Sequence, residues 1–182
     1  MMPPLPKWRT PHRLILYQSL YNVNATFQRV CNDPPMPRPR RVEVMEWLFW
    51  QMGGLGPMAG QNHHFSQYAP EKIPYAVERY VKETNRLYGV LNKRLANREF
   101  IAGQYSIADM ASYPWIVPYK NQSQNIDDFP HLKRWLEAIR ERPATVRAYA
   151  KAKEVNPNYG QPTIRTEEER KLLFGQTAAV VK

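Results

Sequence analysis

Proline is the residue that most limits how this chain folds. Eight of its seventeen prolines fall within residues 1–41, and four of these lie in the stretch NDPPMPRPRR. Each proline fixes its φ angle and removes a backbone donor, so this stretch is predicted to be neither helix nor central strand. Between the proline clusters, HRLILYQSLYNVNATFQRV keeps no clean period, which leaves its structure open. Residues 1–41 are therefore predicted to form an irregular arm rich in proline and arginine.

The charge of the chain is concentrated in the same arm. The net charge is +10, but residues 1–41 hold seven Lys or Arg against one Asp, while residues 42–182 hold nineteen against fifteen Asp or Glu. A basic total favours nucleic-acid binding, yet these charges alternate with prolines and no recognised module accompanies them, so no nucleic-acid partner is expected. An arginine-rich, acid-poor arm also resembles a transit peptide, although serines are few and prolines would break an amphipathic helix.

Cysteine content and hydropathy limit which other classes of protein the chain can belong to. Cys31 is the single cysteine of 182 residues, which excludes a disulfide within the chain and a cysteine-based zinc site, and fits a reducing, cytoplasmic location. No run of eighteen apolar residues exists, so no membrane span is expected. A hydrophobic content of 43% is enough for one domain with a real core.

Helical patterning begins at Val42. Four apolar residues recur at the spacing of one helix face: Met45, Leu48, Phe49 and Met52. Gly53 and Gly54 are predicted to end this helix, because glycine accepts the left-handed conformation common at helix C-termini. A longer helix is predicted after Pro70, through YAVERYVKETNRLYGVLNKRL, with charge pairs four residues apart on its outer face: Glu78 with Lys82, and Arg79 with Glu83.

Capping signals place the later helices. Ser106 and Asp109 form a capping box in SIADMA, and FPHLKRWLEAIRERPA is amphipathic, with four apolar residues facing inward: Leu132, Trp135, Leu136 and Ile139. ATVRAYAKAKEV is a further short helix, and Thr166 with Glu169 opens another. No strand-like alternation follows residue 42. The sequence predicts an all-α body over residues 42–153, followed by a tail of residues 154–182 with one short helix.

The stretch MGGLGPMAGQNHHF raises three hypotheses. A phosphate cradle needs glycines after a strand, and here they follow a helix. A metal site fits poorly, because the adjacent His63 and His64 do not share a helix face. The stretch is therefore predicted to be a turn between two helices, with no metal. No catalytic set of serine, histidine and carboxylate stands out, so no catalytic residue is assigned.

Beyond these patterns, the chain resembles a known family. EWLFWQMGGLGPMAGQNHHFSQYAPEKIPYAVERYVKETNRLYGVLNKRL, SIADMA and FPHLKRWLEAIRERPA are similar, in this order, to the C-terminal helical domain of cytosolic glutathione transferases. The similarity is to the nu-class, YfcG-like disulfide-bond oxidoreductase branch, and it runs from Val42 to Lys153. It implies a glutathione transferase C-terminal-like helical bundle.

The resemblance also implies functional residues. In the family a thioredoxin-like domain precedes the helices and holds most of the glutathione site, whereas residues 1–41 lack its pattern. Arg79 matches an arginine that reaches the carboxylate of glutathione, and Gln51 matches a glutamine that lines the site, in some members from the partner subunit. A guanidinium suits a carboxylate because its planar fork can donate two parallel hydrogen bonds. The alternative for Arg79 is a solvated arginine paired with Glu83.

Three functions follow as hypotheses. The first is a truncated glutathione transferase-family protein with residual glutathione-dependent transferase or disulfide-reductase chemistry. The second is a non-catalytic helical module that forms a homo-oligomer or binds a protein partner, because without the first domain apolar surface near Trp47, Trp50 and residues 52–65 would be uncovered. The third is a gene fragment whose upstream frame encodes the missing domain.

Overall fold

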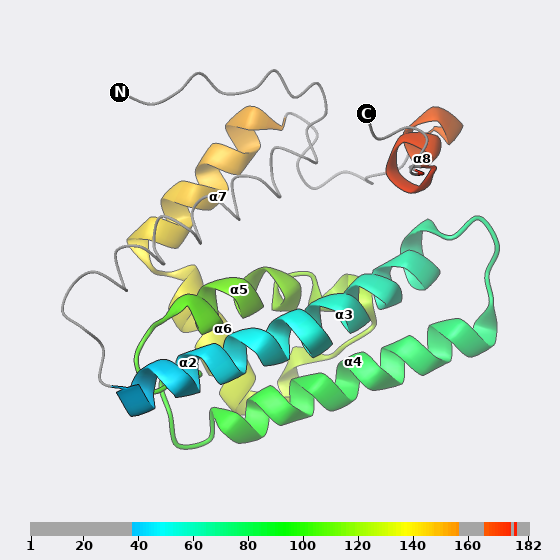
Figure 1. The fold of residues 1–182 in the computed structure, drawn as a ribbon. Coiled ribbons are helices and arrows are strands. Elements are labelled where there is room, and N and C mark those ends of the chain that lie inside the picture. Colours follow the sequence, from blue (N-terminus) through cyan, green and yellow to red (C-terminus); the bar gives the residue numbers. More distant parts are fainter. Residues whose placement is uncertain (1–37, 157–165, 176, 178–182) are drawn as a thin grey trace.

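The computed structural model describes residues 38–156, 166–175 and 177. Within these ranges the chain is all-α, as predicted, and has no β-strand, only isolated bridges in the residue 100–104 turn. Figure 1 shows the arrangement. The α-helices are α2 (Arg38–Trp50), α3 (Gly56–His63), α4 (Pro74–Arg94), α5 (Ile107–Ile116), α6 (Pro130–Arg140), α7 (Pro143–Val155) and α8 (Glu167–Phe174).

The first helix begins earlier than the proline pattern predicted. Helix α2 starts at Arg38 and contains Pro39, so the end of NDPPMPRPRR is helical. A proline in the first helical turn lacks only a donor that would have had no partner there. The prediction that the whole stretch is irregular was therefore wrong for its last four residues.

The prediction of a turn at MGGLGPMAGQNHHF was also wrong. The backbone stays helical from α2 through a π-helical segment, η1 (Gln51–Leu55), into α3, and through a second π-helical segment, η2 (His64–Tyr68). At the end of η1 the Gly56 N–H donates to the Gln51 carbonyl, five residues back. Figure 1 shows α2 and α3 as one long rod above α4.

Close packing explains why glycine lies inside this rod. A Cβ atom on Gly56 would lie 2.7 Å from Gln51 Nε2 and 3.3 Å from the Trp115 ring, so this position accepts only glycine without displacement of a neighbour. Gly53 has no atom within 4 Å of such a Cβ, and its φ is not positive. Gly56 is therefore explained by tertiary packing, which leaves no room for a Cβ atom, and not by termination of a helix.

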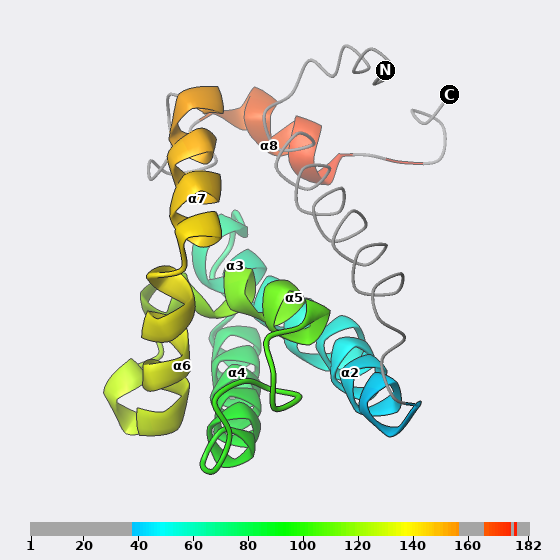
Figure 2. The same ribbon diagram turned by 90° about the vertical axis from the view of Figure 1, so that its left-hand side faces the viewer.

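The core lies where α4, α5 and α6 meet the long rod. All four inward residues predicted for α6 are buried, and they join buried residues of α4: Leu87, Tyr88, Leu91 and Leu95. Figure 2 shows α4 and α5 enclosed between α2 on one side and α6 on the other. Helix α7 extends from α6 away from this core and has no buried residue.

Both predicted capping boxes are present. Ser106 caps α5 with Asp109, and Thr166 caps α8 with Glu169. Asp109 is fully buried, and its carboxylate accepts from the Ile101 and Ser106 backbone N–H groups (both 2.9 Å) and from Trp135 Nε1 (2.8 Å). Burial raises the pKa of Asp109, and these hydrogen bonds act in the opposite direction. One carboxylate thus joins α5, α6 and the turn that precedes them.

Candidate functional site

Arg79 lies in the second turn of α4, at the end of the molecule where the long rod finishes. Its side chain is 56% exposed, and its guanidinium meets Glu83 at 3.8 Å, the pairing predicted from the sequence. At this distance the contact is an ion pair without a short hydrogen bond. A guanidinium has five N–H donors, and none of those on Arg79 makes a hydrogen bond within the described part of the chain.

Glu83 is held mainly by a different arginine. Arg86 donates two hydrogen bonds to its carboxylate, from Nε at 2.9 Å and from Nη2 at 2.7 Å. These bonds from Arg86 hold the pKa of Glu83 below its ordinary value. Because Arg86 occupies the carboxylate with the bidentate geometry, Arg79 is left as the more weakly paired guanidinium of the two.

Aromatic residues border Arg79. Its neighbour Tyr80 stacks on Phe65 of η2, with ring centroids 5.4 Å apart and planes within 5°. On the same segment, His64 meets Phe174 of α8 edge-to-face at 4.9 Å. Arg170 of α8 donates to the Tyr68 carbonyl, near the C-terminal end of the rod. Tyr80, the residue after Arg79, is therefore part of an aromatic contact with η2, and α8 docks on the same segment. Figure 1 shows α8 above the end of the long rod.

Gln51 lies elsewhere, in the interior. It is 3% exposed, and its amide lies against Gly56. Along the rod it is fourteen residues before Phe65, which is about 20 Å of helix. A single copy of the chain therefore does not bring Gln51 and Arg79 together, and Gln51 would have to turn outward to contact a ligand.

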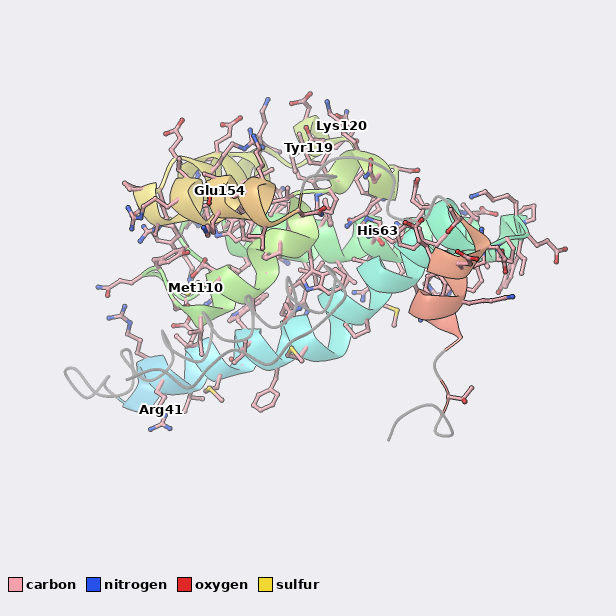
Figure 3. The ribbon with its side chains drawn as sticks, turned by 90° about the horizontal axis from the view of Figure 1, so that it is seen from above. Arg41, His63, Met110, Tyr119, Lys120 and Glu154 are labelled. Atoms are coloured by element: carbon pink, nitrogen blue, oxygen red, sulfur yellow. The ribbon has the colours of Figure 1, made fainter. Side chains whose placement is uncertain are left out.

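His63 is the other histidine of this segment. His63 is half-buried, its Nε2 has no hydrogen-bond partner in the described part of the chain, and burial lowers its pKa. Figure 3 labels it near the end of α3.

Residues 38–156, 166–175 and 177 contain no group of three His, Cys, Asp or Glu that could hold a metal ion. They also contain no helix long and apolar enough to cross a membrane.

A buried polar network that no sequence pattern predicted holds the segment between α5 and α6 in place. Gln122 is fully buried; its amide donates to the Trp115 carbonyl (2.7 Å) and accepts from the Tyr88 hydroxyl (2.7 Å). Asn62 of α3 donates to the Gln122 carbonyl (3.1 Å) and to Thr84 (3.0 Å). Isolated polar residues in a sequence carry no periodic signal, so only the fold brings these together. The network ties α3 to α4 one turn from Tyr80.

The apolar surface expected near the tryptophans is present in part. Trp47 and Trp50 are partly buried and pack against the core. The open surface lies instead along the outer side of α2, where three apolar residues are more than half exposed: Val42, Phe49 and Met52. Figure 3 shows α2 at one edge of the molecule, with Arg41 projecting outward.

Comparison with known proteins agrees with this architecture. Residues 57–143 match the family model of the glutathione S-transferase C-terminal domain. The described helices thus have the fold of the C-terminal helical domain of glutathione S-transferases. Within that class the chain is related to disulfide-bond oxidoreductase YfcG of Escherichia coli, with 55% identity over 113 residues, which cover 62% of this chain.

Solved structures give the same result. Glutathione transferase URE2P6 from Phanerochaete chrysosporium, in complex with oxidized glutathione, is 35% identical with a TM-score of 0.61 and covers 64% of this chain. A glutathione transferase family member from Pseudomonas fluorescens, with two glutathione bound, is 44% identical with a TM-score of 0.55 over 59% of it. The chain spans about half the length of these relatives: 53% of YfcG, 56% of the first structure and 51% of the second.

Proposed function

We propose that this chain is a glutathione-binding helical domain and that Arg79 anchors a carboxylate of the tripeptide. The observation that carries the proposal is the weak pairing of Arg79, since Glu83 is held bidentately by Arg86. An exposed guanidinium with free donors beside a stacked aromatic pair suits a peptide carboxylate. Gln51 is the second proposed glutathione contact. Because it is buried here, its side chain must turn outward to contact a ligand, whether that ligand is bound by the same subunit or by a second one.

Any reaction of this chain would depend on the thiol of bound glutathione. No catalytic residue of this chain is assigned, so a glutathione-dependent transferase or disulfide-reductase reaction would use the sulfur of glutathione itself. In the family a thioredoxin-like domain stabilises that sulfur as a thiolate, and this activity would require such a domain from another polypeptide or from adjoining sequence. A cytoplasmic location belongs to the same proposal.

Calorimetric titration of glutathione into the purified chain tests the proposal. We expect saturable heat in the millimolar range for the wild type, and loss of that heat in Arg79→Gln. Lys82→Gln is the matched control, because Lys82 lies on the same helix, is 74% exposed and pairs with Glu78 rather than with Glu83. No heat at millimolar glutathione, or equal losses in both variants, would leave the proposal without support.

A protein-interaction module is the second candidate function. The observation that favours it is the exposed apolar side of α2, which fits a homo-oligomer or a protein partner. Sedimentation velocity over a range of concentrations tests it. A wild-type chain that stays monomeric at all concentrations and has no partner in a pull-down would contradict it.

A further inference from the structure

The outer side of α2 and of the start of η1 forms a continuous stripe, defined here by Val42, Glu46, Phe49, Met52 and Gly53. Its three apolar side chains are exposed by 65%, 67% and 61%, in chain order, and spacings of seven and three residues place them on one helix face. Glu46 lies between them, exposed, and forms no ion pair with any residue of the described ranges. The stripe is therefore an apolar surface with one free negative charge.

We propose that residues 12–30 of this same chain cover the stripe. Connectivity allows it, because Val30 lies eight residues before Arg38, where α2 begins. Eight extended residues reach up to about 28 Å, whereas the stripe starts four residues into α2 and is only about 16 Å long. The segment can thus fold back along α2 over its whole length.

The chemistry of the segment matches that of the stripe. Residues 12–30 contain no acidic residue, and they carry Arg13 and Arg29 to pair with Glu46. Their apolar residues would bury against Val42, Phe49 and Met52: Leu14, Ile15, Leu16, Leu20, Val23 and Phe27. Apolar contact together with opposite charge defines the recognition.

The area of the stripe favours a tethered occupant over a second copy. Three half-exposed apolar side chains offer roughly 350 Å², less than half of the ~800 Å² per partner that a stable interface buries. A segment linked to α2 by a few residues binds at an effective concentration in the millimolar range, so a smaller area is sufficient. A second copy or another protein would reach the stripe only by displacing this segment. The arm therefore sets the concentration at which the chain associates, which goes beyond glutathione binding and does not depend on it.

Cross-linking from the single native cysteine tests this contact in the full chain. Cys31 adjoins the segment, and Gly53→Cys adds a second thiol on the stripe, where a new Cβ meets open space. Gly89→Cys on α4 is the matched control, because its Cβ is equally unhindered. Gly89 lies five residues from Arg94, which contacts Glu43 of α2, so a randomly placed arm would reach it as readily. Circular dichroism checks that both variants fold.

With a bismaleimide whose span matches the ~16 Å length of the stripe, we expect the link within one chain to form at least about tenfold faster in Gly53→Cys than in Gly89→Cys. Adding Phe49→Lys to Gly53→Cys should slow that link several-fold. Equal rates at the two positions, or no effect of Phe49→Lys, would overturn the proposal. Links formed only between chains would overturn it too, since they assign the stripe to a second copy, and the glutathione titration would be unaffected by any of these results.

Discussion

Two charged side chains of this bundle have opposite surroundings. The Asp109 carboxylate is fully buried and accepts hydrogen bonds from Ile101, Ser106 and Trp135. The Arg79 guanidinium is more than half exposed and meets its carboxylate partner only at 3.8 Å. Asp109 needs nothing from outside the chain, whereas Arg79 has donors to spare. The site around Asp109 thus satisfies its own charge, and the start of α4 is where an external carboxylate would be bound.

The largest effect is expected for the buried Asp109. Asp109→Ala leaves four buried donors without their acceptor, removes the Asp109 half of the α5 capping box, and should cost about 3–5 kcal/mol of unfolding free energy. Urea denaturation followed by circular dichroism measures it. Asp127→Ala is the control, since Asp127 is exposed and paired only with Lys133, and should change stability by less than about 0.5 kcal/mol. Similar losses in the two variants would contradict the role given to Asp109.

Two glycines test the continuity of the long rod. Gly56→Ala would force a Cβ against Gln51 and Trp115, and should cost about 1–3 kcal/mol. Gly53→Ala meets open space in a helical backbone, and should stabilise the chain by about 0.5–1 kcal/mol. Thermal denaturation of both variants measures the difference. If alanine destabilised the chain at residue 53 as well, the left-handed turn first expected there would be favoured over the helix.

At the exposed Arg79, Glu83 competes with any ligand for the guanidinium. Glu83→Gln removes the negative charge and should strengthen glutathione binding about two- to fivefold, the range of a surface ion pair. Isothermal titration calorimetry measures the affinity. Glu78→Gln is the control, because Glu78 pairs with Lys82 rather than with Arg79. A weaker or unchanged affinity in Glu83→Gln would show that Glu83 does not restrain Arg79.

The smallest effect concerns His63. Burial lowers its pKa below 6.5, so the folded chain binds a proton less readily than the unfolded chain. Stability should therefore fall as pH drops through and below 6.5, and His63→Phe should reduce this fall. Urea midpoints at pH 7.5 and pH 5.5 measure it. A wild type and a variant with the same pH dependence would assign the effect to other groups.

Sequence patterns predicted the closed part of the molecule best. The inward residues of α6 and both capping boxes follow from spacing alone, because each depends on residues within one or two turns. The predicted helix end at Gly53 and Gly54 was wrong, because local propensity does not include tertiary contacts. One such contact, between Gly56 and Trp115, lies far along the chain. For Arg79, spacing predicted the partner Glu83 but not that Arg86, at three residues, would take the bidentate geometry.

The most direct test of the open guanidinium changes the ligand rather than the protein. Glutathione and its diethyl ester, in which both carboxylates are neutral, are titrated side by side into the wild-type chain and into Arg79→Gln. We expect the acid to bind the wild type at least about fivefold more tightly than the ester, and this preference to disappear in Arg79→Gln. Equal binding of acid and ester by the wild type, or a preference that persists without Arg79, would contradict the account.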